Sequence, residues 1–158
     1  HYGRYRRDRR GGAQLLLIGK LAMEPPRVPG VRYVGYVSEA EKMAAMAGAK
    51  AILCPSLYES LSIVLLEGFA LGTPALVNGR SAVLRDHAVR SRAALHYASA
   101  EEFVEALDLL VAEDRLRIAM GDNGTRYVRG NYRWDVVMAK YRGLIAAVAG
   151  GSTTTGSL

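Results

Sequence analysis

The chain has almost no cysteine, with the single thiol of Cys54 among 158 residues. One cysteine excludes an internal disulfide, which favours a cytoplasmic protein. The three histidines (His1, His87 and His96) are scattered along the sequence, so they form no metal-ligand spacing and no Cys/His catalytic pair. We therefore expect no metal site.

Long hydrophobic runs are also lacking. No apolar stretch approaches the roughly 18 residues that a membrane-spanning helix requires. Hydrophobic residues nevertheless make up 50% of the chain, which is enough to build one core. The composition therefore predicts one globular domain.

Basic residues outnumber acidic ones, with 21 Lys and Arg against 15 Asp and Glu. The excess is local, because the opening segment HYGRYRRDRR carries most of it. Such a run is most often the solvated face of a helix end, and no finger motif or stripe of aromatics interleaved with Arg accompanies it. We expect no nucleic-acid partner.

Short apolar runs alternate with segments of helical periodicity, a pattern typical of a parallel α/β sheet. The predicted fold class is therefore α/β, a Rossmann-like parallel sheet flanked by helices. Strands are predicted at 14–19, 31–37, 51–55, 75–77 and 93–98. Helices are predicted at 38–48, 62–71, 99–113, 114–127 and 134–148.

The predicted sheet has few strands for a doubly wound domain, and the chain opens inside a helix end without a preceding strand. We expect one domain over residues 1–149 that lacks its first strand, as a fragment of a longer protein. The polar tail over 150–158 is expected to be disordered.

A carboxylate stands inside the apolar stretch YESLSIVLLEGFALGTP. One helical turn from Glu67 lie Ile63, Val64, Ala70 and Leu71, all of them apolar. An ionised carboxylate in such surroundings is costly unless it has a partner. Two interpretations stay open: Glu67 points outward or pairs with a nearby Arg, or it lines a cleft and meets a ligand hydroxyl.

The loop PSLYESLS joins the third predicted strand to this helix, at the edge where open parallel sheets bind ligands. Ser62 is the expected N-cap, and the amides from Leu61 to Val64 are expected to be free at the helix start, as a seat for an anion. Glu59 and Glu67 flank these amides. The arrangement suits a ligand with a phosphate centre and hydroxyl groups on either side, which is the layout of a nucleotide sugar.

The pattern P-S-x-x-E-x-x-x-I-V-L-L-E-G-F-A-x-G-T-P, from Pro55 to Pro74, resembles the E-x7-E signature of retaining glycosyltransferases of the GT-B fold, known as family 4 or group 1. The two glutamates match at Glu59 and Glu67. The resemblance extends over about residues 14–148 and covers the nucleotide-sugar half of a two-domain enzyme.

The resemblance implies transfer of a hexosyl group from a nucleotide diphosphate sugar, such as UDP- or GDP-hexose, to an acceptor with retention of configuration. It implies that the catalytic-site carboxylate of Glu59 contacts donor-sugar hydroxyls, and that Glu67 accepts hydrogen bonds from the ribose. No cofactor is implied. The other implied donor contacts are the backbone of Ser60, Leu61, Ser62, Ile63 and Val64, with Gly19, Tyr36 and Val37 beside the nucleotide. For Tyr36, a half-buried strand aromatic is an equally open interpretation.

Two departures from the family bear on this interpretation. Members usually have Gly at position 62 and Ala at position 68, where this chain has Ser62 and Gly68. Sugar specificity and activity therefore stay open. Arg80 is either a phosphate contact or a surface residue.

The acceptor (a sugar, a lipid or a polysaccharide) is expected to bind an N-terminal domain absent from this chain, so that the fragment alone is inactive. Peripheral membrane contact would belong to the full-length enzyme. Two alternatives remain, a nucleotide-sugar epimerase of related architecture and a non-catalytic nucleotide-binding module.

Overall fold

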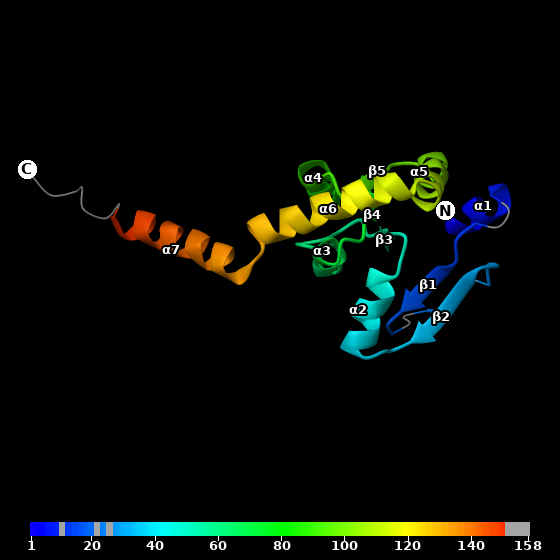
Figure 1. The fold of residues 1–158 in the computed structure, drawn as a ribbon, viewed down its shortest axis with the longest axis horizontal. Helices are drawn as coiled ribbons and strands as arrows, with labels where there is room; N and C mark the ends of the chain where they lie inside the picture. The colour runs from blue at the N-terminus through cyan, green and yellow to red at the C-terminus, as the bar shows by residue number, and fades with distance from the viewer. Residues whose placement is uncertain (10–11, 21–22, 25–26, 151–158) are drawn as a thin grey trace, which may run out of the picture.

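The computed structural model describes residues 1–9, 12–20, 23–24 and 27–150. Strands and helices alternate along the first two thirds of the chain, and helices follow (Figure 1). The strands are β1 (Leu15–Ile18), β2 (Val31–Gly35), β3 (Ile52–Cys54), β4 (Ala75–Asn78) and β5 (Ala94–Tyr97). The helices are α1 (Tyr2–Asp8), α2 (Glu39–Ala47), α3 (Ile63–Ala70), α4 (Ala82–Ser91), α5 (Ala100–Ala112), α6 (Asp114–Asn131) and α7 (Trp134–Gly150).

All strand pairs are parallel, which confirms the predicted α/β class. Over the described residues the strands form two ladders, β1–β2 and β3–β4–β5. β4 has a neighbour on both sides and is buried at all four positions, as expected of a central parallel strand. β1 is equally apolar, but Leu16 is 44% exposed. In the described part of the chain, β1 pairs on one side only, with β2.

Each predicted strand and helix is present within a few residues, but α4 was not predicted. Its buried residues recur with helical spacing at Leu84, His87, Ala88 and Ser91. Two of these four are polar, which hides the apolar periodicity on which the sequence reading depends. Ser81 caps the helix by accepting a hydrogen bond from the Leu84 amide.

The helix α7 extends away from the rest of the chain beyond the end of α6 (Figure 1). Gly150, expected to open the disordered tail, is instead the last residue of α7. Residues 151–158, the rest of that predicted tail, lie outside the described residues.

The basic N-terminal segment is a helix, α1, as expected, but it is not simply a solvated face. Arg4 forms an ion pair with Glu101, and Arg9 pairs with Glu105 at 2.8 Å and with Asp108 at 3.0 Å. The three acids lie on one side of α5 at helical spacing. Part of the local positive charge is therefore neutralised within the chain.

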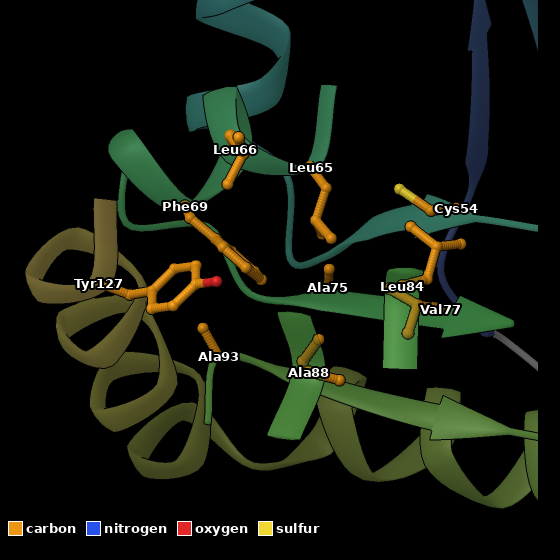
Figure 2. Close-up of a cluster of buried hydrophobic side chains, with 11 residues drawn as sticks. Cys54, Leu65, Leu66, Phe69, Ala75, Val77, Leu84, Ala88, Ala93 and Tyr127 are labelled. Atoms are coloured by element: carbon orange, nitrogen blue, oxygen red, sulfur yellow. The ribbon is translucent and has the colours of Figure 1, made fainter. Parts of the chain in front are cut away.

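The first core cluster joins α3, α4 and α6 to the three-stranded ladder (Figure 2). Phe69 of α3 is fully buried and meets the ring of Tyr127 edge-on, with centroids 6.4 Å apart. A second cluster lies under α5. Its buried members are Tyr5, Leu76, Tyr97, Phe103, Val104, Leu107, Leu110 and Met120.

Two glycines let α6 approach α3 closely. A Cβ on Gly121 would lie 2.1 Å from the Gly72 carbonyl oxygen, and a Cβ on Gly124 would lie 3.1 Å from the Phe69 Cβ. Gly72 itself has a φ of +76°, which favours glycine. The next residue, Thr73, is buried and donates its hydroxyl to the Met46 carbonyl at 2.9 Å. The turn at Gly72–Pro74 thus connects α3 to both α2 and α6.

We expect Gly121→Ala to lower the free energy of unfolding by about 1–3 kcal/mol, because the new methyl must displace backbone. Gly130 lies in the same helix with no atom within 4 Å of an added Cβ. Gly130→Ala should therefore be neutral or stabilise by up to about 1 kcal/mol through helix propensity. Urea denaturation of both variants measures the difference. Equal effects would contradict the close packing of α6 on α3.

Candidate functional site

The predicted site loop, residues 55–62, follows the carboxyl end of β3 and leads into α3. It has no regular structure of its own, and buried polar side chains from two other elements hold its ends. Asn78, the last residue of β4, donates its side-chain amide to the Pro55 carbonyl at 3.0 Å. His87 of α4 lies 3.0 Å from the Leu61 carbonyl. The loop is therefore fixed on both sides of Glu59.

Ser62 occupies the N-cap position of α3, but in a way that the sequence did not predict. Its backbone is left-handed, with φ 59° and ψ 69°, and its side chain makes no capping hydrogen bond. The expectation of side-chain capping is wrong, because a left-handed residue does not aim its hydroxyl at the first-turn amides. The conformation favours glycine, which accounts for the residue usual at this position in the resembled family.

The first turn of α3 is accordingly open. The Ser62 carbonyl accepts from the Leu65 and Leu66 amides, at 3.1 Å and 3.3 Å. The preceding amides, of Ile63 and Val64, belong to the helix start, where no intrahelical acceptor exists. Their side chains are 66% and 51% exposed. This end of α3 is a place where an anion can accept hydrogen bonds from the backbone.

Glu67 has a partner within the chain. The Lys42 ammonium of α2 lies 3.1 Å from each carboxylate oxygen of Glu67, and it also pairs with Glu39 at 2.8 Å. These two carboxylates raise the pKa of Lys42, with Glu39 the larger cause. Of the two interpretations left open for Glu67, the structure shows pairing within the chain, with a lysine in place of an arginine. A lysine supplies the charge that the apolar neighbours in sequence cannot.

The helix around Glu67 is also less buried than its sequence suggests. Leu65, Leu66, Gly68 and Phe69 face the core, whereas Ile63 and Val64 face outward. The Glu67 side chain is 24% exposed, at the border between these two faces. Part of the carboxylate is thus accessible from outside while Lys42 holds it in place.

Gly68 is explained by its packing partner. A Cβ at this position would lie 2.8 Å from Cγ1 of Ile52 in β3. The isoleucine fills the space that an alanine would need. The glycine in α3 thus compensates for the larger side chain of Ile52 in β3.

Cys54 and Glu59 lie close enough to influence one another. Burial raises the pKa of the Cys54 thiol to about 11, and the charge of Glu59 contributes. The Ser62 side chain opposes the shift by hydrogen bonding. The thiol is therefore protonated at neutral pH, which makes it a weak nucleophile.

Three of the sequence-predicted residues follow the ends of β1 and β2. The Gly19 amide donates to the Gly35 carbonyl at 2.8 Å, and both glycines have positive φ, +121° and +78°. A Cβ on Gly19 would meet no atom within 4 Å, so its backbone angle, and not crowding inside the chain, favours glycine. Tyr36 is 90% exposed and lies beyond the end of β2, which contradicts the half-buried strand interpretation. Val37 follows it and is partly buried.

His87 is the site residue that the sequence reading missed. It is 4% exposed, and its Nδ1 lies 3.0 Å from the Tyr127 hydroxyl, which in turn is 3.4 Å from the Tyr132 hydroxyl. The Leu61 carbonyl can only accept, so Nε2 carries the proton and Nδ1 accepts from Tyr127. No motif signals this residue, because its helix was not predicted.

A groove of about 390 Å³ opens beside this histidine. Its lining joins the site loop to α4 and to the α6–α7 junction, through Ser60, Leu61, Ala82, Val83, Asp86, His87 and Tyr132. A larger groove, of about 490 Å³, lies between α4, β5 and α6, away from the predicted site residues. We place the candidate site beside the smaller groove, because Ser60 and Leu61 of the site loop line it.

Among the residues that the structure describes, no group of three or more His, Cys, Asp or Glu side chains is placed to hold a metal ion. None of the described helices is long and apolar enough to cross a bilayer.

Parallel strands, crossover helices and an open helix start at the carboxyl edge define an α/β domain of Rossmann-like architecture. The model of the family described as "Glycosyl transferases group 1" matches residues 26–127. The chain belongs to the group 1 glycosyltransferases. Its fold is similar to that of sucrose-phosphate synthase from Thermosynechococcus elongatus, with a TM-score of 0.66 and 21% identity over 78% of this chain and 31% of that one.

Two relatives illustrate the family. Phosphatidyl-myo-inositol mannosyltransferase of Mycobacterium leprae is 34% identical over 149 residues, which is 86% of this chain and 38% of the relative. Glycosyltransferase 1 domain-containing protein 1 of Xenopus tropicalis is 26% identical over 121 residues, 75% of this chain and 34% of the relative. The chain thus spans little more than a third of the length of these relatives.

The left-handed Ser62 provides a stability test. Ser62→Gly should raise the free energy of unfolding by up to about 1 kcal/mol, because glycine adopts positive φ without a Cβ clash. Ser62→Ala keeps the clash and removes only the hydroxyl, so we expect it to be neutral or destabilising. Chemical denaturation of the two variants distinguishes the outcomes. A Gly variant no more stable than the Ala variant would contradict the strain.

The buried His87 predicts a pH dependence. Burial lowers the pKa of His87 below its usual 6.5, against the opposing effects of the Leu61 carbonyl and Asp86, while Arg90 adds to the lowering. As pH falls below about 6.5, the unfolded chain binds the proton first, so the free energy of unfolding should fall. His87→Gln should weaken this fall between pH 7.5 and 5.5, measured by urea denaturation. His96→Gln, at an exposed site, is the control and should retain it.

Proposed function

We propose that this chain is the donor-binding domain of a retaining glycosyltransferase that moves a hexosyl group from a nucleotide diphosphate sugar to an acceptor. Membership of the group 1 family supports glycosyl transfer. The observation that carries the donor assignment is the open first turn of α3, where a left-handed Ser62 leaves the Ile63 and Val64 amides uncapped. Together with the helix dipole, these amides suit a diphosphate.

The two glutamates take different roles in this proposal. Glu59 lies in the loop fixed at both ends, where its carboxylate would contact hydroxyls of the donor sugar. Glu67 would accept hydrogen bonds from the ribose, as the family resemblance implies. Lys42 holds the Glu67 carboxylate oriented before the donor arrives, so the ribose would share a carboxylate that is already fixed. Pre-organisation of this kind lowers the cost of binding.

The remaining donor contacts come from the loop backbone and from the ends of β1 and β2. Ser60 and Leu61 line the groove beside α4. Tyr36 is exposed enough to cover a base. Val37 follows it after β2, and Gly19 follows the neighbouring parallel strand β1. The leaving nucleotide diphosphate gains negative charge, which backbone amides stabilise. The proposal requires no cofactor beyond the donor.

The acceptor site belongs, in this proposal, to a domain outside the chain, which covers little more than a third of the length of its curated relatives. The name of the Mycobacterium leprae relative specifies a mannosyl group and a phosphatidyl-myo-inositol. It supports a hexose donor such as a GDP-sugar and makes a lipid one candidate acceptor, beside a sugar or polysaccharide. A lipid acceptor would bring the full-length enzyme to a membrane surface.

Calorimetric titration of the chain with UDP and GDP tests the donor site. We expect weak binding of one of them, and Glu67→Gln should weaken it about tenfold, the value of a charged hydrogen bond of about 1.4 kcal/mol. Glu39→Gln is the matched control, because Glu39 also pairs with Lys42 but lies outside the proposed donor contacts.

Absence of heat with both nucleotides at millimolar concentration would overturn the donor assignment. An equal loss in the two variants would assign the effect to Lys42 and not to a ribose contact. Transfer activity is to be measured on the protein that includes the acceptor domain, where retention is read from the anomer of the product.

A further inference from the structure

A chain of hydrogen bonds runs from the end of α6, through His87 of α4, to the site loop. Tyr132, at the end of α6, lies 3.4 Å from the Tyr127 hydroxyl, and this hydroxyl lies 3.0 Å from Nδ1 of His87. Nε2 of the same ring reaches the Leu61 carbonyl at 3.0 Å. The acceptor-only carbonyl fixes the direction of every bond: Tyr132 donates to Tyr127, Tyr127 to Nδ1, and Nε2 to Leu61.

The chain of bonds ends at the peptide that precedes the left-handed residue. The Leu61 carbonyl belongs to the peptide bond between Leu61 and Ser62, so its direction is linked to the φ of Ser62. A non-glycine residue relaxes from this conformation unless its surroundings hold it. Ser62 is itself buried, at 8% exposure, and His87, which bonds to the preceding carbonyl, is 4% exposed. The histidine therefore has the geometry to hold the strained turn.

The histidine is itself held rigidly. Its ring packs edge-on against Tyr127, with centroids 5.9 Å apart and planes at 84°, and it also contacts the ring of Tyr132 at 6.0 Å. The Arg90 guanidinium lies over the Tyr127 ring, 5.8 Å from its centroid. A buried ring that packs on two aromatic side chains and hydrogen-bonds through both nitrogens is held in one orientation.

We propose that His87 is a positioning residue of the donor site, which locks the Leu61 carbonyl and thereby keeps Ser62 left-handed and the first-turn amides of α3 free for the donor. The inference rests on the proposed function, since the donor is what these amides would bind. His87 acts through the loop and touches no reacting atom. The Leu61 carbonyl sets its tautomer, and the Tyr127 hydroxyl donates to the other ring nitrogen.

Two variants of the chain separate the lock from simple packing. His87→Phe keeps the ring and its aromatic contacts but loses both hydrogen bonds. His87→Gln restores one amide donor at the reach of Nε2. We expect hydrogen exchange of the Leu65 and Leu66 amides, which bond to Ser62, to accelerate about tenfold or more in the Phe variant and much less in the Gln variant.

Nucleotide affinity is the second readout. The Kd for whichever of UDP and GDP the wild type binds should rise about tenfold in His87→Phe and recover most of this loss in His87→Gln. Leu110→Ala is the control for general destabilisation, because Leu110 is fully buried in the second core cluster, which contains no residue of the site loop. It should lower stability without changing Kd.

The outcomes are distinguishable from those of the proposed function. If the wild type binds neither nucleotide, the donor assignment fails, and the exchange of the Leu65 and Leu66 amides still decides the lock. Wild-type exchange and wild-type affinity in His87→Phe would overturn the inference, as would an equal rise in Kd for Leu110→Ala. Should the Phe variant not fold, nitrogen NMR of the wild-type imidazole decides: a proton on Nδ1 in place of Nε2 would refute the direction of the bonds.

Discussion

The structure of the candidate site depends on how one irregular loop is held. Residues 55–62 carry Glu59 and end in a strained turn, and neither a strand nor a helix fixes them from within. Buried side chains of β4 and α4 bond to the carbonyls at its two ends, at Pro55 and Leu61. The sheet and α4 thus determine the shape of the loop through polar groups as well as through apolar packing.

A carboxylate that is already paired changes how the family motif is understood. Lys42 and Glu67 come from adjacent helices, α2 and α3, and the pair is partly accessible. An ion pair at this depth contributes little stability by itself, because desolvation and side-chain ordering offset the attraction. Its value lies in orientation. The ion pair fixes the direction of the carboxylate, so an incoming hydroxyl would meet an oriented acceptor instead of a mobile side chain.

Sequence patterns predicted the strands, most helices and the loop that carries the motif, because hydrophobic period and turn residues are local signals. They failed at α4, where His87 and Ser91 occupy core positions and interrupt the apolar period. They also failed at the partner of Glu67, because Lys42 is 25 residues away and only packing of α2 on α3 brings them together. The left-handed Ser62 was equally hidden, since serine ordinarily indicates a cap. Each failure involves a polar residue whose role is set by a contact distant in sequence.

Cys54 offers a consequence of its own. Cys54 is 6% exposed at the end of β3, close to Glu59 and Ser62, and the raised pKa of its thiol keeps it unreactive. No other sulfhydryl exists in the chain to compete for a label. Alkylation therefore requires the residues that cover this thiol to move away from the strand. The rate at which this native thiol is labelled therefore reports how often the local structure at the end of β3 opens, without any engineered probe.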